Sequence, residues 1–436
     1  MKANNKVSIV DTGPLKGNSE FIGGKFVRYD EDIRNIKAAI KKAVDLAVGG
    51  INNIVKSGET VLVKPNLAFQ APPESFAVVD PRVVEALIAY LKEDSLAGRV
   101  VIGDNPSLGP YVGLSRPAFA QSGMEAAACR GGIDEIIYFD ETETVDIDIP
   151  KAKFFKQAKV FKPFLDADRV INLPKMKVHI GGVVTLGLKN WNGIVPYEHP
   201  SGQQQGCHRI DLGPKLADIY RIRRADLTIV DGIIGMEGQG PHAGTPIEMN
   251  LLIAGIDTVA VDAVTAYQMG FEPAEIPAIR CAATEGLGIM DLKKIEVVGE
   301  GVEDHRKFFK RPCSDPISMY KGIDIYAQQT CPGCYTYIRG ALDSFYNAGY
   351  NTPEKLAAYL KKVGEIVIVA GGVPSLDPEF VRNKNLFEVG DCWKLFPSRE
   401  MVEEASKLAK KVVEYPGCSP VYVFSQLPVD LQEMDK

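Results

Sequence analysis

The feature that most constrains the fold is the alternation of short apolar runs with amphipathic segments. The runs "TVLVKPN", "RVVIGDNP", "RVINLPKMK" and "LTIVDGIIG" are typical of buried strands, and each ends in polar residues. Apolar positions recur at helical spacing from Ile33 to Ala47, and "DPRVVEALIAYLKE" places Asp80 before Pro81, which is a favoured helix start. This order predicts an α/β fold with a mainly parallel sheet flanked by helices.

The chain of 436 residues is too long for one hydrophobic core. The charged segment "GEGVEDHRKFFKRPCSDPIS" suggests a boundary, so we expect a large lobe over 1–315 and a smaller α/β lobe over 316–436. In the smaller lobe, "CYTYIRGALDSFYNAG", "TPEKLAAYLKKVG" and the Ser-capped "SREMVEEASKLAKKVVEY" predict helices. "EIVIVAGG" and "LFEVGDC" predict strands.

Charge and hydropathy exclude several classes of protein. A net charge of -6 argues against sequence-independent binding of nucleic acid, which needs a basic face. No apolar run approaches the length of a membrane span, and "MKANNKVSIVDTG" lacks the apolar core of a signal peptide. We therefore expect a cytoplasmic protein that binds neither nucleic acid nor membranes.

Charged and amide side chains follow several of the predicted strands. They are Lys64, Asn66, Asp104, Asn105, Lys175, Lys177 and Asp231. Ligands of open parallel sheets bind beyond the carboxyl ends of the strands, so these residues predict one shared crevice. The alternative is that polar residues simply fit best at strand ends.

The segment "LPKMKVHIGGVVTLGLKNWNGIVP" contains Lys175, Lys177, His179 and Lys189 but no acidic residue. Because a buried lysine needs a nearby anion to keep its charge, the segment predicts either an internal partner or an anionic ligand. The internal partner would be Asp231 or Glu237. Within the same segment, the amides of Asn190 and Asn192 could orient a polar substrate.

The glycine-rich segment "DGIIGMEGQGPHAGTP" contains Asp231, Glu237 and His242. Five glycines and two prolines predict a rigid irregular loop rather than a helix or strand. No helix can begin directly after "GMEGQG", so we reject a dinucleotide site there. Glu237 is an acid–base or metal-binding candidate, or else the salt-bridge partner of Lys175 or Lys177.

Four cysteines lie in turns of the last quarter of the chain: Cys331 and Cys334 in "CPGC", Cys392 in "VGDCW" and Cys418 in "YPGCSP". Four thiolates can hold an iron–sulfur cluster, which we expect to be of the four-iron, four-sulfide type, or a tetrahedral zinc ion. A redox-active Cys331–Cys334 pair at a helix start is a third interpretation.

The blocks "KPN", "DNP", "LPKMKVH…TLGLKNWNG", "DG…GMEGQGPHAGTP" and "DTVAVDAVTA" resemble, in this order, the Domain of Unknown Function 362 family from about Val61 to Val264. Many members of that family carry a ferredoxin-like segment with two iron–sulfur clusters. This chain lacks the C-x-x-C-x-x-C-x-x-x-C-P run of such a segment. The resemblance therefore does not imply bacterial-type ferredoxin chemistry here.

The basic segment is also similar, more remotely, to the amino-terminal domain of nickel-pincer lactate racemases. In that family a histidine precedes the lysine that anchors the cofactor, and a second histidine downstream binds nickel. The likeness places His179 and Lys189 in the first two roles and His199 or His208 in the third. Neither the family's preceding arginine nor its carboxyl-terminal substrate residues can be placed in this chain.

Together these features predict an iron–sulfur-dependent oxidoreductase or isomerase that acts on a small anionic organic substrate. Lys64, Lys175, Lys177 and Lys189 would bind carboxylate or phosphate groups, with Asn66, Asn190 and Asn192 orienting the substrate. His179 and Glu237 would handle protons near Asp231, or His179 would bind a metal. The alternatives are an electron-transfer or cluster-handling protein without a substrate of its own, and a zinc-bearing or nickel-pincer enzyme. An electron-transfer protein would be a further partner.

Overall fold

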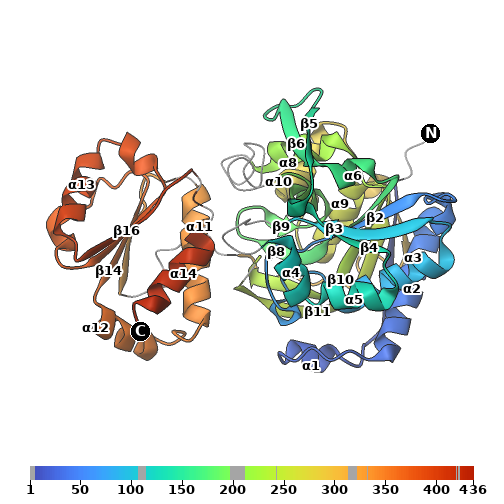
Figure 1. The fold of residues 1–436 in the computed structure, drawn as a ribbon, viewed down its shortest axis with the longest axis horizontal. Coiled ribbons are helices and arrows are strands. Elements are labelled where there is room, and N and C mark those ends of the chain that lie inside the picture. The colour runs from blue at the N-terminus through green and yellow to red at the C-terminus, as the bar shows by residue number, and fades with distance from the viewer. Residues whose placement is uncertain are drawn as a thin grey trace. The chain divides into compact units, whose positions relative to one another are not determined.

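The computed structural model describes residues 5–106, 114–196, 212–241, 243–312, 322–330, 332–418, 420 and 423–436. The chain divides into two compact units (Figure 1). Unit 1 takes in residues 1–203 and 211–312, and unit 2 takes in residues 204–210 and 313–436. Residue 315, the predicted boundary, lies outside the described residues. Each unit is built from a sheet flanked by helices, so the predicted α/β class is confirmed.

The main sheet of unit 1 is mixed and mostly parallel. Its described strands lie in the order β12-β1-β11-β10-β7-β2-β3-β4, with β8 paired to β10 and β9 paired to β8. Their bounds are β1 Lys6–Asp11, β2 Thr60–Pro65, β3 Arg99–Asp104, β4 Glu135–Tyr138, β7 Arg169–Leu173, β8 Lys175–His179, β9 Val183–Thr185, β10 Leu227–Gln239, β11 Ala243–Gly255 and β12 Glu296–Gly299. β5 Thr144–Asp148 and β6 Gln157–Phe161 form a separate antiparallel pair.

Helices cover both faces of this sheet (Figure 1). The α-helices are α1 Asn18–Ile22, α2 Asp30–Val48, α3 Pro81–Asp94, α4 Ser115–Gln121, α5 Met124–Gly131, α6 Lys162–Asp166, α7 Gly187–Asn190, α8 Leu212–Ile222, α9 Thr258–Gln268 and α10 Pro277–Thr284. Short 3₁₀ helices are η1 Ile51–Asn53, η2 Pro73–Ser75, η4 Phe139–Glu141, η5 Trp191–Ile194, η7 Pro273–Glu275 and η8 Leu292–Lys294.

The central strands are mostly apolar because both of their faces are buried. Val61 and Val63 of β2 belong to the core that contains α2 and α3. Leu62, which lies between them and is fully buried, points to the opposite face. On that face a Cβ at Gly255 would lie 2.9 Å from Val261 of α9, and α9 packs in turn on α7 and α10. The continuous apolar runs in the sequence therefore mark central strands.

The helix signal at Asp80 correctly predicts where α3 begins. Asp80 caps α3 by accepting a hydrogen bond from the N–H of Arg82, and Pro81 opens the helix as expected. The helical spacing from Ile33 to Ala47 belongs to α2, which ends at Val48 because Gly49 adopts the left-handed conformation with φ of 74°. The residues that begin or end a helix lie next to it in the sequence, so the sequence alone can locate these boundaries.

The prediction of an irregular loop over "DGIIGMEGQGPHAGTP" is wrong. β10 continues through Gln239 and pairs antiparallel with β11, forming a long hairpin with an irregularity between Gly232 and Ile234. Two of the glycines serve close packing, whereas Gly238 has a positive φ of 75° and no close neighbour. A Cβ at Gly235 would lie 3.0 Å from Phe309, and one at Gly240 would overlap the carbonyl of Val178. These neighbours are distant in the sequence, and no local pattern reveals them.

Unit 2 contains a parallel sheet in the order β13-β14-β15-β16. The strands are β13 Ile323–Tyr326, β14 Ile366–Ala370, β15 Asn385–Val389 and β16 Lys411–Tyr415. The helices are α11 Pro332–Asn347, α12 Pro353–Val363, α13 Arg399–Leu408 and α14 Val423–Glu433, with η9 Pro378–Val381 and η10 Cys392–Leu395. Ile366 and Ile368 share a core with α11, α12 and α14, whereas Val367 packs with Val402 of α13.

The predicted helix "SREMVEEASKLAKKVVEY" is only partly correct. Its first half forms α13, but Lys411–Tyr415 is the edge strand β16. Ser398 precedes the helix without capping it, because its hydroxyl oxygen accepts a hydrogen bond from the N–H of Val373 instead. The β-branched pair Val412 and Val413 favours a strand, and pairing with β15 outweighs the helical spacing of the preceding residues.

Candidate functional site

The polar ends of β2 and β3 meet in a buried ion pair. Lys64 Nζ lies 2.6 Å from Asp104 Oδ1, and the second carboxylate oxygen accepts the N–H of Leu67 at 3.0 Å. Burial lowers the pKa of Lys64 and raises the pKa of Asp104, since water is excluded from both charges, and each partner offsets part of that effect. The counter-ion of Lys64 is therefore internal.

Gly193 of η5 packs directly against this pair. A Cβ at position 193 would overlap Asp104 Oδ1 and lie 2.7 Å from Lys64 Nζ. Only glycine lets the backbone of "NWNG" approach the ion pair so closely. The glycine in this segment is thus explained by a contact with strand ends far away in the sequence.

Asn190 joins the segment to two of the neighbouring strands. Its Oδ1 accepts a hydrogen bond from Asn66 Nδ2 at 3.1 Å, and its Nδ2 donates to Asn172 Oδ1 at 2.8 Å. Nδ2 also lies 3.2 Å from the carbonyl oxygen of Lys64. The structure brings Lys64, Asn66 and Asn190 together, and with them Asn172, which the sequence analysis did not single out within an apolar strand. That these residues bind a substrate stays a prediction.

Lys175 forms a second buried ion pair, with Asp231. Lys175 Nζ lies 2.8 Å from Asp231 Oδ2, which also accepts the N–H of Asp80 at 2.8 Å. Asp80 is bound by Arg82, whose guanidinium also contacts Asp32 at 3.1 Å. Of the two internal partners considered for the lysines, Asp231 is the one that Lys175 takes. The contacts of Arg82 with Asp80 and Asp32 could not be predicted from the sequence, in which Asp80 stood out only as a helix cap.

Lys177 has a different environment from those two lysines. Its Nζ donates to the carbonyl oxygen of Ala77, a neutral acceptor. Burial lowers the pKa of Lys177 well below its ordinary value, and the positive charges of Lys189 and Lys175 lower it further. No carboxylate of the described residues opposes this effect. We call Lys175, Lys177 and Lys189 the basic cluster.

His179 follows Lys177 on β8 and is buried. Its Nδ1 accepts hydrogen bonds from the N–H groups of Gly181 at 2.9 Å and Gly182 at 3.0 Å. Because Nδ1 uses its lone pair as an acceptor, the ring proton belongs on Nε2. In this conformation His179 can therefore donate a proton through Nε2, and it could bind a metal only after that proton is lost.

Asp262 of α9 holds the turn that carries Lys189 and Asn190. Its carboxylate accepts the N–H groups of Gly187 at 2.7 Å and Leu188 at 2.8 Å, where α7 begins. Burial raises the pKa of Asp262 to about 7, although the two hydrogen bonds act in the opposite direction. Sequence analysis missed this residue because it lies inside an apolar helix.

Several amide atoms near these pairs are buried without a hydrogen-bond partner among the described residues. They are Asn66 Oδ1 and both side-chain polar atoms of Asn192. Asn192 is only 3% exposed. Leaving such groups unpaired costs about 1–3 kcal/mol each, so they are the atoms that a polar ligand would satisfy.

Glu237 lies on the hairpin strand β10 and is bound by Lys310. Glu237 Oε1 is 3.0 Å from Lys310 Nζ, and Oε2 accepts the N–H of Lys310 at 2.9 Å. The ion pair of Glu237 is thus with Lys310 and not with Lys175 or Lys177. His199, His208 and His242 lie outside the described residues.

In unit 2 three of the predicted cysteine ligands gather at the carboxyl end of the parallel sheet. Cys334 lies in the first turn of α11, Cys392 opens η10 after β15, and Cys418 follows β16. The Sγ atoms of Cys392 and Cys418 are 3.9 Å apart. A Cβ at Gly390 would lie 3.0 Å from the Sγ of Cys334, so glycine there keeps the turn after β15 close to the third thiol.

The described residues contain no preformed group of three or more histidine, cysteine or acidic side chains arranged to hold a metal ion. Cys331, the predicted fourth ligand, lies outside the described residues. What the structure places together is therefore the Cys392–Cys418 pair, with Cys334 beside the same turn.

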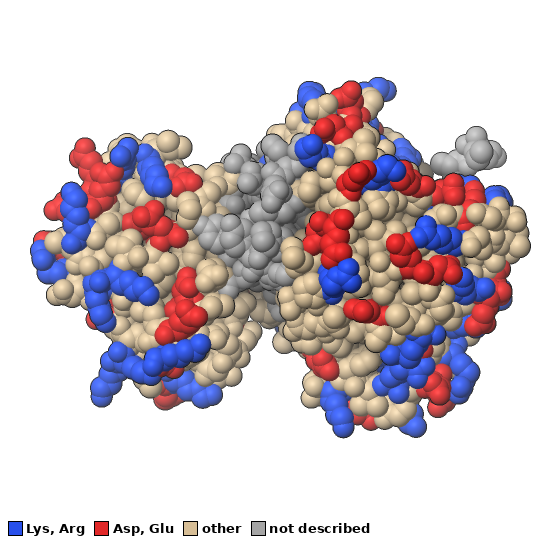
Figure 2. Space-filling model, in the orientation of Figure 1, with Lys and Arg blue, Asp and Glu red and all other residues tan. Residues whose placement is uncertain are grey.

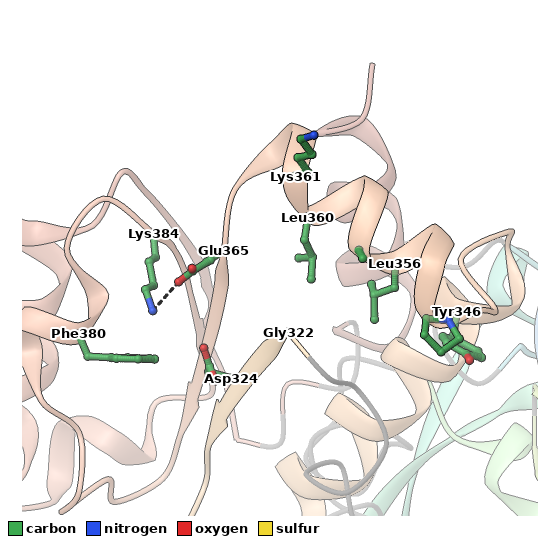
Figure 3. Close-up of a pocket in the computed structure, with 11 residues that line it drawn as sticks. Gly322, Asp324, Tyr346, Leu356, Leu360, Lys361, Glu365, Phe380 and Lys384 are labelled. Atoms are coloured by element: carbon green, nitrogen blue, oxygen red, sulfur yellow. Dashed lines mark ion pairs between the residues drawn. The ribbon is translucent and has the colours of Figure 1, made fainter.

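A separate cavity of about 940 Å³ lies at the opposite, amino end of the unit 2 sheet (Figure 3). Gly322, Glu365 and Lys384, which precede three of the strands, line it together with Leu356, Leu360 and Phe380. Lys384 is paired to Glu365 at 2.6 Å, as the dashed line in Figure 3 marks. Parallel sheets bind ligands at their carboxyl ends, so this cavity is not the expected site.

The exposed charges form no basic face in the view drawn. Figure 2 shows lysines and arginines interspersed with acidic residues over both units. The lysines at the candidate site do not contribute to this surface, since Lys64, Lys175 and Lys177 are buried. Within the described part of the chain, every helix is too short or too polar to cross a bilayer.

Comparison with known proteins identifies the family. The model of the family described as "Domain of unknown function (DUF362)" matches residues 61–267, which confirms the resemblance predicted from the sequence. A curated relative, the thylakoid-associated protein sll1697 of Synechocystis sp., is 32% identical over 249 residues, covering 56% of this chain and 72% of the relative. The chain belongs to the DUF362 family.

The apoprotein of lactate racemase from Thermoanaerobacterium thermosaccharolyticum is among the similar solved structures. The match covers 88% of this chain and 81% of that chain, at 10% sequence identity and a TM-score of 0.34. A likeness of this size supports no statement about the activity or cofactor of this protein.

Proposed function

We propose that the protein is an enzyme that holds an iron–sulfur cluster in unit 2 and acts on a small anionic organic substrate in unit 1. The observation that carries the proposal is the gathering of Cys334, Cys392 and Cys418 at one end of a parallel sheet. These residues come from three separate segments, and the carboxyl ends of parallel strands are where such sheets bind ligands.

The residues present fit a thiolate-bound centre. Soft sulfur ligands select iron–sulfur clusters, zinc or copper(I) over hard cations. Gly390 leaves space beside Cys334 that a Cβ would narrow, and Gly390 and Gly417 both have a positive φ, a conformation that favours glycine. Cys331 would be the fourth ligand, by its sequence position alone. When bound, the cluster supplies electron transfer.

Zinc is the second candidate, and one distance favours it. Two thiolates on one tetrahedral zinc ion, each about 2.3 Å from the metal, lie about 3.8 Å apart. The Sγ atoms of Cys392 and Cys418 are 3.9 Å apart. A zinc ion with four protein ligands would stabilise unit 2 and leave all of the chemistry to unit 1.

The substrate site that we propose in unit 1 is built around the basic cluster. Lys175 is balanced by Asp231, but no described carboxylate acts on Lys177. A bound carboxylate or phosphate would supply negative charge to this cluster at Lys189, and the unpartnered amide of Asn192 could hydrogen-bond to the rest of the substrate. Lys64 has Asp104 as its partner, so we expect Lys64 to position the segment and not to bind the anion.

The reaction class that we propose is redox chemistry or isomerisation of an organic acid. His179 would move the proton, since its Nδ1 is fixed by two N–H groups and Nε2 carries the hydrogen. An electron-transfer protein would be the partner of the redox form of the reaction. We propose a cytoplasmic location, and fractionation of cells that express a tagged protein would test it.

The cluster is tested by the visible absorption of anaerobically purified protein. Wild type should show a broad band that bleaches on reduction with dithionite. Cys392→Ser should lose the band, whereas Cys129→Ser, an exposed cysteine of unit 1, should keep it. A colourless wild-type protein would contradict the cluster.

The anion site is tested by the melting temperature with and without L-lactate, pyruvate or inorganic phosphate. A ligand that binds only the folded protein raises the melting temperature in proportion to its affinity. Wild type and Lys92→Met, which changes an exposed lysine paired with Asp134, should both respond to one of these anions. Lys189→Met should lose the response. Equal responses of wild type and Lys189→Met would contradict the site.

A further inference from the structure

Three side chains on β8 share one face of the strand. Lys175, Lys177 and His179 alternate along the strand, and successive residues of a strand point to opposite sides. All three are buried, with exposed fractions of 1%, 1% and 5%. β8 therefore presents two amines and an imidazole in a row, inside the protein.

The two amines of this row differ in their partners. Lys175 donates to a carboxylate, that of Asp231, whereas Lys177 donates to the carbonyl of Ala77. A carbonyl oxygen stabilises an ammonium ion less than a carboxylate does, and Lys175 and Lys189 add positive charge nearby. A lysine that is buried beside other cations gives up its proton and becomes a nucleophile at neutral pH.

We propose that Lys177 is an imine-forming residue and that the substrate is a small oxo acid, a molecule with one carbonyl and one carboxylate. This inference rests on the proposed function, whose anion site would bind the carboxylate. The neutral amine of Lys177 attacks the carbonyl carbon and forms a carbinolamine. The carbinolamine then loses its oxygen as water, which takes both amine protons, so that a carbon–nitrogen double bond replaces the carbon–oxygen double bond.

His179 is placed to assist the loss of water. It is the next residue on the same face of β8, and the hydrogen on its Nε2 could be transferred to the departing hydroxyl. The imidazole would then recover a proton from the nitrogen, so no net acid is consumed. Lys175 stays paired with Asp231, so we assign the carboxylate of the substrate to Lys189, the other lysine whose charge acts on Lys177.

The experiment is reductive trapping with pyruvate as the probe. Wild-type protein is incubated at neutral pH with pyruvate and cyanoborohydride, which reduces an imine to a stable amine, and the labelled lysines are located by peptide mass spectrometry. An ordinary lysine with a pKa of about 10.4 is almost entirely protonated at neutral pH. Lys177 should therefore be labelled at least about tenfold more than the exposed lysines.

Two variants serve as controls. Lys177→Met should abolish the dominant label, and Lys215→Met, which changes another buried lysine of unit 1, should leave it in place. Because the label is mapped on wild-type protein, the test does not depend on whether Lys177→Met folds.

The melting temperature with pyruvate separates failure of this inference from failure of the proposed function. A rise in melting temperature together with a label on Lys177 supports both. A rise without a label on Lys177, or with labels spread over exposed lysines, overturns the imine and leaves the anion site. Neither a rise nor a label, with glyoxylate as well as pyruvate, overturns both the imine and an oxo acid as substrate.

Discussion

The Oδ1 atom of Asp262 accepts a hydrogen bond from the N–H of Gly187 at 2.7 Å. Asp262 lies inside α9, and Gly187 opens the short helix that carries Lys189 and Asn190. The carboxylate of Asp262 thus holds the start of α7 by hydrogen bonds, although burial favours its protonated, uncharged form. The pH dependence of this contact can be measured.

Asp262 should make the protein less stable as the pH rises from about 4 to about 7. Its folded pKa of about 7 lies above the value of an unfolded aspartate, so the folded state favours the protonated form. That contribution is complete below the unfolded pKa and is lost as the pH rises through the folded pKa. The difference of about three pKa units between the folded and unfolded states corresponds to a loss of about 4 kcal/mol in the free energy of unfolding.

The measurement is urea unfolding of wild type and Asp262→Asn at several pH values. The free energy of unfolding of wild type, relative to that of Asp262→Asn, should fall across this range. A difference between the two proteins that does not change with pH would contradict the raised pKa of Asp262.

Gly193→Ala should destabilise unit 1 by about 1–3 kcal/mol, because the new methyl group would overlap the Lys64–Asp104 pair. Gly181→Ala is the matched control, since a Cβ there meets His179 only at an ordinary 3.5 Å. Chemical unfolding of both variants measures the two costs. Equal costs would show that η5 does not rest on the ion pair.

Lys64→Met should cost about 3–5 kcal/mol, because it leaves Asp104 buried without its partner. Replacing both residues, as Lys64→Met with Asp104→Leu, should recover part of that loss, since no buried charge remains. Lys92→Met breaks an exposed pair with Asp134 and should cost at most about 1 kcal/mol. Additive effects of the two buried substitutions would argue against a coupled pair.

Lys175→Met and Lys177→Met should differ, although the two lysines lie on the same strand. Lys175→Met leaves Asp231 buried without its positive partner and should lower the free energy of unfolding by about 3 kcal/mol or more. Lys177 donates to a carbonyl and not to a carboxylate, and burial lowers its pKa, so Lys177→Met leaves no buried charge behind and should cost less than Lys175→Met. The measurement is the free energy of unfolding of both variants at the same pH. Equal losses for Lys175→Met and Lys177→Met would contradict the difference between their partners.

Local and non-local interactions explain which features could be read from the sequence. Asp80 and Gly49 act on the helices next to them, so the start of α3 and the α/β alternation follow from short stretches of chain. The meeting of Lys64 with Asp104 also follows in outline, since both stand at the carboxyl ends of neighbouring parallel strands.

The features that the sequence did not reveal depend on distant neighbours. The sequence pattern placed Gly235 and Gly240 in a loop. In the structure they lie in the hairpin, where a larger side chain would collide with Phe309 or Val178. Asp262 lies within an apolar helix and has no polar pattern around it. Whether a buried lysine has a carboxylate or a carbonyl as its partner is likewise decided by residues from other segments, such as Asp231 and Ala77.

The most direct test of the proposed iron–sulfur cluster is elemental analysis of anaerobically purified protein for iron, acid-labile sulfide, zinc and nickel. We expect about four irons and four sulfides per chain in wild type. Cys334→Ser and Cys392→Ser should lose most of both. About one zinc per chain without sulfide would contradict the cluster and make the cysteines of unit 2 a structural metal site.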